Sequence, residues 1–191
     1  MQPADPSSSD PAPGDAAPAA RKRPKPGERR EQILQTLAQM LERPGAERVT
    51  TAALAARLQV SEAALYRHFA SKAQMFEALI DFIERNVFGL IGHIAEREPA
   101  GTARAARIVA MVLQFGEKNP GMARVMVGDA LVLEHERLQQ RMNQLFDKLE
   151  AALRQSLREA PAEGSPTPDA DAQATAAVLA AFVAGRLQRF A

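Results

Sequence analysis

The chain has 191 residues, no cysteine, and 24 basic against 23 acidic side chains. Its hydrophobic fraction of 46% is sufficient for a packed core, and the absence of cysteine excludes disulfides, thiolate metal sites and cysteine nucleophiles. No run approaches the roughly 20 apolar residues of a membrane span, and the N-terminus lacks the apolar stretch of a signal peptide. We therefore expect a cytoplasmic protein that does not bind membranes.

The N-terminal segment 1–27 is rich in proline, serine and alanine, a composition that cannot bury a core. We expect it to be a disordered tail. Basic residues crowd its end and the start of the next segment. They are Arg21, Lys22, Arg23, Lys25, Arg29 and Arg30. Such a basic arm is suited to contact DNA phosphates, although a solvated tail explains the same pattern equally well.

A first helix is predicted over 28–43, where apolar side chains recur at intervals of three and four. Pro44-Gly45 ends this helix. Two short helical segments follow, up to about residue 69. Because short helices are not stable alone, we expect the first helix to pack on them and to close a small domain over 28–88.

The segment at about 50–69 meets the physical requirements of a helix-turn-helix. Thr50 or Thr51 can cap its first helix, and Ser61 can cap the second. Gln59 departs from the usual pattern, because this turn position is commonly glycine and a left-handed backbone costs other residues roughly 1 kcal/mol. The spacing alone fits an ordinary helical hairpin equally well.

The rest of the chain, 89–191, is predicted to be a larger helical domain. A helix that opens at Thr102 is apolar nearly all round, so we expect it to be buried at the centre. A long amphipathic helix is predicted over about Ala130–Glu159, and a final helix from about Asp171. No segment has a strand pattern. The predicted fold class is all-α.

The run Ser61-Glu-Ala-Ala-Leu-Tyr-Arg-His-Phe69, followed by Ser71-Lys72, distinguishes this motif from an ordinary hairpin. It resembles the recognition helix of the TetR family of transcription regulators. The resemblance implies a three-helix DNA-binding domain, a long fourth helix that leads into a larger helical domain, and a homodimer. Members of the family continue for a further helix beyond the position of Ala191, so we expect the dimer interface to be incomplete in this sequence.

The residues that match the family's DNA-contacting positions come from the motif and from the start of the next helix. They are Thr50, Thr51, Ser61, Glu62, Ala63, Ala64, Tyr66, Arg67, His68 and Lys72. By this resemblance, Ser61 to Ala64 face base edges of double-stranded DNA. Tyr66 and Lys72 are expected to hold phosphates.

Four longer strings, at 29–42, 49–76, 115–126 and 141–159, narrow the resemblance. They are similar to a branch of the TetR family that acts in nucleoid occlusion. This resemblance implies a protein that is associated with the nucleoid and binds palindromic chromosomal sites. While bound, it is expected to bind the C-terminal tail of the tubulin-like division protein FtsZ and to block Z-ring assembly over the nucleoid.

In that branch, the FtsZ tail binds between the fourth and fifth helices. The matching positions are Phe82, Met111, Phe115, Lys118 and Asn119. Because FtsZ tails are acidic with apolar anchors, a groove for them needs apolar walls and a cation. Lys118 stands where the branch has arginine, which keeps the charge but loses the bidentate fork. The first three residues could equally be core, and the last two could cap a helix end.

Two alternative functions remain open. Most proteins of this family are repressors in which a small molecule enters the second domain, and Met111, Met122 and Met126 could line a pocket for one. An enzyme is disfavoured, because the three histidines are far apart in sequence and form no metal or nucleophile motif. We therefore expect no cofactor and no bound metal.

Overall fold

The structure is a computed structural model, and it describes residues 27–43, 49–159 and 168–191. Its elements are α1 (Glu28–Leu41), α2 (Thr51–Leu58), α3 (Glu62–Tyr66), α4 (Lys72–Arg97), α5 (Gly101–Lys118), α6 (Pro120–Met126), the 3-10 turn η1 (Asp129–Leu131), α7 (Glu136–Arg158) and α8 (Pro168–Leu187). The described residues form no strand, which confirms the all-α fold class. Residues 1–26 of the predicted tail and the Pro44-Gly45 stop lie outside the described residues.

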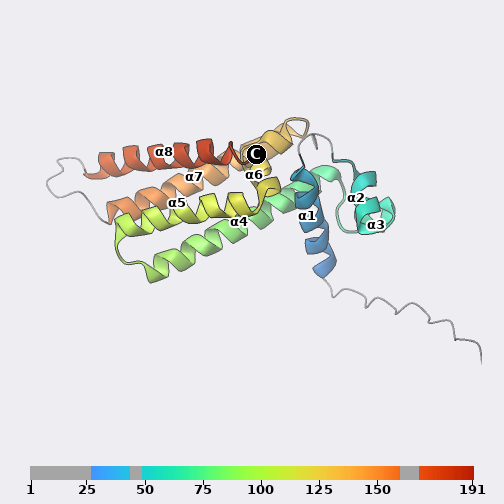
Figure 1. Cartoon of the computed structure of the whole chain (residues 1–191), viewed down its shortest axis with the longest axis horizontal. Coiled ribbons are helices and arrows are strands. Elements are labelled where there is room, and N and C mark those ends of the chain that lie inside the picture. Colours follow the sequence, from blue (N-terminus) through green and yellow to red (C-terminus); the bar gives the residue numbers. More distant parts are fainter. Residues whose placement is uncertain (1–26, 44–48, 160–167) are drawn as a thin grey trace, which may run out of the picture.

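The helices form two groups, which we call the head and the bundle (Figure 1). The head consists of α1, α2 and α3. The bundle consists of α4, α5, α7 and α8, which run side by side. The domain boundary predicted near residue 88 falls inside α4, which continues from the head into the bundle. None of the described helices is both long and apolar enough to cross a membrane.

Hydroxyl side chains cap α2, α3 and α4, as the sequence predicts for the first two of these helices. Thr50, Ser61 and Ser71 each accept a hydrogen bond from the backbone N–H three residues further on, at 3.1–3.2 Å. Gln59 ends α2 in the left-handed conformation expected at the turn, with φ 55° and ψ 45°. Among the described residues it is the one non-glycine residue with a positive φ.

The head closes on a small core of its own, to which each of its helices contributes. Leu37 of α1, Leu54 of α2 and Leu65 of α3 are almost completely buried, together with Phe76 from the start of α4. This core explains how α3, with five residues, keeps its helical conformation, because a helix of that length gains its stability from packing.

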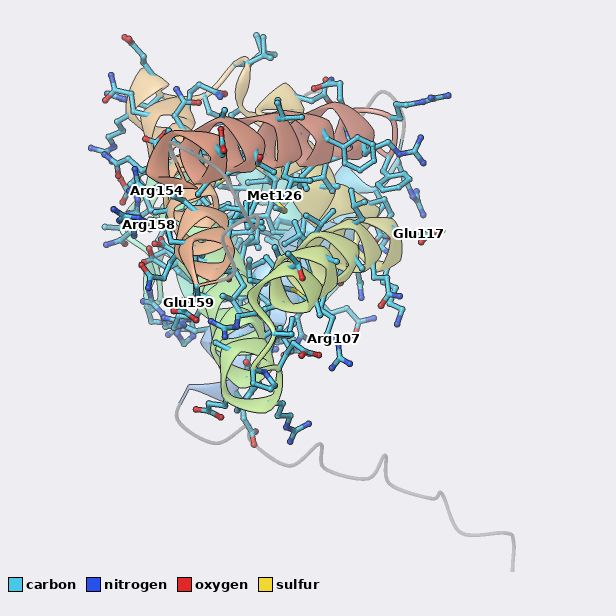
Figure 2. The ribbon with its side chains drawn as sticks, turned by 90° about the vertical axis from the view of Figure 1, so that its left-hand side faces the viewer. Arg107, Glu117, Met126, Arg154, Arg158 and Glu159 are labelled. Carbon is cyan, nitrogen blue, oxygen red and sulfur yellow. The ribbon has the colours of Figure 1, made fainter. Side chains whose placement is uncertain are left out.

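The bundle core is continuous with that of the head. Figure 2 looks along the bundle from the end farthest from the head. It shows Met126, which is buried, deep among the helices, whereas the exposed side chains of Arg107, Glu117 and Arg154 lie at the periphery. The bundle therefore presents charged residues to solvent around an apolar interior.

Three predictions for the second domain are wrong in detail. α5 is not buried all round; its buried stripe consists of Gly101, Ala105, Ile108, Val112 and Gly116, and its other large apolar residues are half-buried. The helix predicted over about Ala130–Glu159 begins at Glu136, because η1 turns the chain first and His135 is extended, with ψ 132°. α8 begins at Pro168 rather than Asp171.

We call α6, η1 and the residues up to α7 the junction, because they join the head to the bundle. Gly121 of α6 lies directly on α1, and a Cβ atom there would stand 2.0 Å from the carbonyl oxygen of Ala38. Arg124, 7% exposed, donates hydrogen bonds to the carbonyl oxygens of Leu41 and Arg43 at the end of α1, at 2.9 and 3.1 Å. Its guanidinium also binds Asp129 at 2.6 Å. These contacts fix α1 to α6.

Candidate DNA-binding surface and partner site

The residues predicted to contact DNA lie together around α3 and at the starts of α2 and α4. Six of them are exposed: Thr50, Ser61, Glu62, Ala63, Tyr66 and Arg67. Four are half-buried: Thr51, Ala64, His68 and Lys72. The sequence predicted a recognition helix that continues to His68. In the structure α3 ends at Tyr66, so Arg67 and His68 lie in the turn that follows. We call this surface the DNA face.

Two polar contacts on the DNA face join α2 to α3. The hydroxyl of Thr51 donates a hydrogen bond of 2.6 Å to Oε2 of Glu62. The hydroxyl of Tyr66 lies 3.5 Å from Oγ1 of Thr51, a weak hydrogen bond at the limit of the normal range. The first contact therefore orients the Glu62 carboxylate, whereas the second leaves the Tyr66 hydroxyl largely available to a ligand.

Arg30 of α1 holds the end of the recognition helix in place. Its guanidinium donates a hydrogen bond of 2.7 Å to the carbonyl oxygen of His68 and stacks over the ring of Phe69, 4.2 Å from the ring centroid. This contact joins residues 38 positions apart in sequence. The sequence left open a phosphate contact or a solvated side chain for Arg30, and no local pattern could have revealed this partner.

Lys72 has an acidic partner that the sequence prediction missed. Its Nζ lies 2.5 Å from Oε1 of Glu134, which comes from the turn between η1 and α7. The side chains of Lys72 and Glu134 are only 29% and 12% exposed. A DNA phosphate at Lys72 would therefore have to share the ammonium group with this carboxylate or displace it.

The predicted partner-binding residues gather only in part. Phe82 of α4, Phe115 of α5 and Asn119 line one hollow of about 320 Å³. Met111 and Lys118 are not among its lining residues. The rest of the wall comes from Gln35, Ala38 and Gln39 of α1, from Glu42 directly after α1, and from Asn86 of α4 and Met122 of α6. We call it the Phe82 hollow, and α1 of the head forms one of its sides.

Phe82 also lines a second hollow, of about 460 Å³, further along α1 and α4. Its charged lining residues are Glu28, Arg30, Glu31, Asp81 and Arg85. Arg141 of α7 donates a hydrogen bond of 2.7 Å to Asp81, so this acid is already paired. Together the two hollows make an amphipathic groove along α1 and α4, with the half-buried Phe82 between them.

Asn119 has a structural role beside its place in the Phe82 hollow. Its side-chain amide donates a hydrogen bond of 2.7 Å to the carbonyl oxygen of Phe115, which satisfies the last turn of α5. Its side chain makes no capping bond to α6. The helix-end role left open by the sequence is therefore present for Asn119, whereas Lys118 is exposed.

A cluster of charges fixes α4 against α7 below this groove. Arg141 bonds both Asp81 and Glu84, at 2.7 and 3.1 Å, and Lys148 also pairs with Glu84. The hydrogen bond from Lys148, helped by Arg141, lowers the pKa of Glu84 against the opposing effect of burial. The hydrogen bond to Asp81 raises the pKa of Arg141. Among the described residues, no cluster of three or more acidic, histidine or cysteine side chains could hold a metal ion.

Comparison with known proteins agrees with this architecture. Residues 33–79 match the family described as bacterial regulatory proteins of the tetR family, and residues 100–191 match the SlmA-like form of the tetracyclin repressor-like C-terminal domain. A crystal structure of a TetR-family transcriptional regulator from Bordetella parapertussis 12822 superposes with a TM-score of 0.61 over 86% of this chain and 94% of that one. At 17% identity, that likeness shows the fold alone. The fold and the motif define a helix-turn-helix protein of the TetR family.

Full-length relatives narrow the class further. The nucleoid occlusion factor SlmA of Enterobacter sp. (strain 638) is 51% identical over 163 residues, which cover 85% of this chain and 82% of that protein. The SlmA protein of Marinomonas sp. (strain MWYL1) is 48% identical over 166 residues, 87% of this chain and 84% of that protein. The chain belongs to the SlmA family of nucleoid occlusion factors.

Proposed function

We propose that this chain acts as a DNA-bound homodimer that binds the FtsZ tail and blocks Z-ring assembly over the nucleoid. One observation carries the proposal. Phe82, Phe115 and Asn119, which the sequence singled out from different elements, converge on a hollow that α1 of the head also lines. A partner seated there would contact both the DNA-binding head and the bundle. Its affinity would therefore depend on how DNA holds the head.

The DNA part of the proposal rests on the DNA face. Ser61, Ala63 and Ala64 at the start of α3 have short side chains, so the N-terminus of the helix can approach base edges in a major groove. The exposed Tyr66 and Arg67 flank its end, where phosphates run past a recognition helix. Arg30 would keep that end at a fixed angle through its bond to the carbonyl oxygen of His68.

The dimer part rests on α8. Val178 and Phe182 stand 66% and 49% exposed on one side of this helix, while Ala176, Val183 and Leu187 are buried on the other. A second copy packed on the exposed side would bury these apolar groups. In such a dimer, the two α3 helices would fit the halves of a palindrome about one DNA turn apart.

The FtsZ part rests on the chemistry of the groove. Phe82 and Phe115 offer half-buried aromatic rings to an apolar anchor, and Gln35, Gln39 and Asn86 offer hydrogen-bonding side chains around it. The exposed Arg85 and Lys118 are cations available to an acidic tail at either side. We place the protein in the cytoplasm, on the nucleoid, because both proposed partners are found there.

The decisive experiment measures binding of a labelled FtsZ C-terminal tail peptide by fluorescence anisotropy, with and without a specific palindromic duplex. Phe82→Ala should weaken tail binding at least about fivefold, because truncation of a central aromatic anchor typically costs about 1 kcal/mol or more. Val132→Ala, which changes an exposed apolar residue outside both hollows, is the matched control. If the tail peptide binds neither with nor without the duplex, the FtsZ proposal is refuted. A Lys118→Glu variant that binds the peptide normally would remove only that residue from the site.

A second measurement tests the DNA assignments separately. Tyr66→Ala should weaken binding to specific and random duplexes alike, because a phosphate contact carries no sequence information. A loss confined to the specific duplex would show that Tyr66 contacts a base. A metabolite that stabilises the protein in a thermal-shift panel and also releases DNA would instead support the ligand-responsive repressor.

A further inference from the structure

An acidic residue occupies the centre of the DNA face. Glu62 is the first residue of α3, and among the residues predicted to touch DNA it is the one carboxylate. A negative charge beside phosphates is repelled, so it weakens binding to DNA in general. The orientation of its carboxylate is fixed, because the Thr51 hydroxyl donates a hydrogen bond of 2.6 Å to Oε2.

The chemistry of the major groove leaves a carboxylate only one good partner. An ionised carboxylate only accepts hydrogen bonds. Guanine and thymine present acceptors at their major-groove edges, and adenine presents the N7 acceptor beside its amino group. Cytosine presents the N4 amino donor without a neighbouring acceptor. A carboxylate at the start of a recognition helix therefore selects cytosine and disfavours the other bases.

We propose that Glu62 is a specificity-determining residue that accepts a hydrogen bond from the N4 amino group of one cytosine in each half of the DNA site. Thr51 is its positioning residue: the hydroxyl holds Oε2 and leaves Oε1 directed to the base. This inference rests on the proposed binding of α3 in the major groove. It adds the base that is recognised and the reason why an acid is retained on a DNA-binding surface.

A purely structural role for Glu62 makes a different prediction. An acid in the first turn favours the helix N-terminus electrostatically, and the bond to Thr51 ties α3 to α2. If that were its whole function, replacing Glu62 would weaken binding to every duplex. If Glu62 contacts cytosine, replacing it removes a repulsive charge, and binding to random duplex becomes tighter while selectivity at one position falls.

The test is selection of binding sites from a duplex library with random sequence, using the full chain. The wild type is expected to select cytosine at one fixed position of each half-site. Replacing that cytosine by thymine should weaken wild-type binding at least about fivefold, the low end for a good base contact. Glu62→Ala should bind the two duplexes equally well. Glu62→Gln, which can still accept the Thr51 hydrogen bond, should shift the preference towards adenine, the base that glutamine pairs with.

Matched variants separate the two residues. Thr51→Ala is expected to lower the cytosine preference, and Thr51→Ser, which restores the hydroxyl, is expected to recover it. Glu96→Gln, an exposed acid at the far end of α4, should change no position. A Glu62→Gln variant that selects the same bases as the wild type at every position would overturn this inference alone. A wild type that selects no sequence at all would overturn the proposed sequence-specific function as well.

Discussion

The starts of the helices on the DNA face are held by contacts between residues close in sequence, whereas the junction is held by contacts between residues far apart in sequence. On the DNA face, Thr50 and Ser61 bond backbone groups three residues away. At the junction, Arg124 bonds the carbonyl oxygen of Leu41, 83 residues earlier in the chain. The difference shows that where these helices begin is a local property, whereas the orientation of the head relative to the bundle depends on the whole fold.

The largest effect is expected at the junction itself. Arg124→Ala leaves two carbonyl oxygens at the end of α1 and the Asp129 carboxylate without their partner. Removing one member of a buried charged network typically costs 3–5 kcal/mol, so we expect a loss of about 3 kcal/mol in the free energy of unfolding. Chemical denaturation measures it. Arg137→Ala, which removes an exposed pair with Glu77, is the control and should cost less than about 1 kcal/mol. If Arg124→Ala and Arg137→Ala lower the free energy of unfolding equally, the junction contacts stabilise the fold no more than an exposed ion pair does.

A smaller effect is expected where the two regions meet, at Lys72. Glu134→Gln removes the carboxylate that competes with DNA phosphate for the ammonium group, and should tighten DNA binding a few-fold, corresponding to about 1 kcal/mol. Anisotropy titrations at fixed salt measure it. Glu136→Gln changes an exposed acid two residues away and controls for the general loss of negative charge. Weaker binding by the Glu134 variant would show that the carboxylate positions Lys72 for DNA rather than competing with it.

The turn of the DNA face offers a still smaller, stabilising change. Gln59→Gly relieves the left-handed strain at φ 55° and should raise the free energy of unfolding by about 0.5–1 kcal/mol, after the extra chain entropy of glycine is counted. Ala56→Gly, in the regular helix just before it, should lower the same quantity by about 1 kcal/mol. If both substitutions destabilise the protein in thermal denaturation, the turn is not strained.

The smallest effect is expected from the charges between α4 and α7, which lie away from both regions. In the folded protein the pKa of Glu84 is below its ordinary value of 4.5. Its ionised form is thus favoured by folding, and this stabilisation is full above 4.5 and is lost as the pH falls through the lower, folded-state pKa. Glu84→Gln should cost about 0.5 kcal/mol near neutral pH and nothing in strong acid. Glu117→Gln, an exposed control, should show no such pH dependence.

The parts of the molecule that could be predicted from sequence are those with local signals. Capping hydroxyls predicted the starts of α2 and α3, and the left-handed turn at Gln59 followed from the motif. The start of α7 was wrong because Ala130 to Leu133 extend the apolar pattern backwards, whereas these residues form part of η1 and a turn, and His135 is extended. A nearly all-round apolar pattern gave α5 the wrong burial, because periodicity does not reveal how many neighbours a helix has.

The site could be predicted only residue by residue, not as an arrangement. Phe82, Phe115 and Asn119 were singled out by resemblance. The α1 wall of their hollow was not, because the sequence assigns α1 only to the packing of the head. The partners of Arg30 and Lys72 lie 38 and 62 residues away. Charged side chains make up 25% of the sequence, so no sequence pattern shows which of them meet.

The close approach of Gly121 to Ala38 has a consequence for how such proteins can evolve or be rebuilt. With no room for even one methyl group between α1 and α6, the head is not an interchangeable module. A chimera that imports a foreign head on residues 28–76 would need a matching α6 to dock it. Grafting the two pieces together should preserve the spacing of the two half-sites on DNA, and grafting the head alone should alter it.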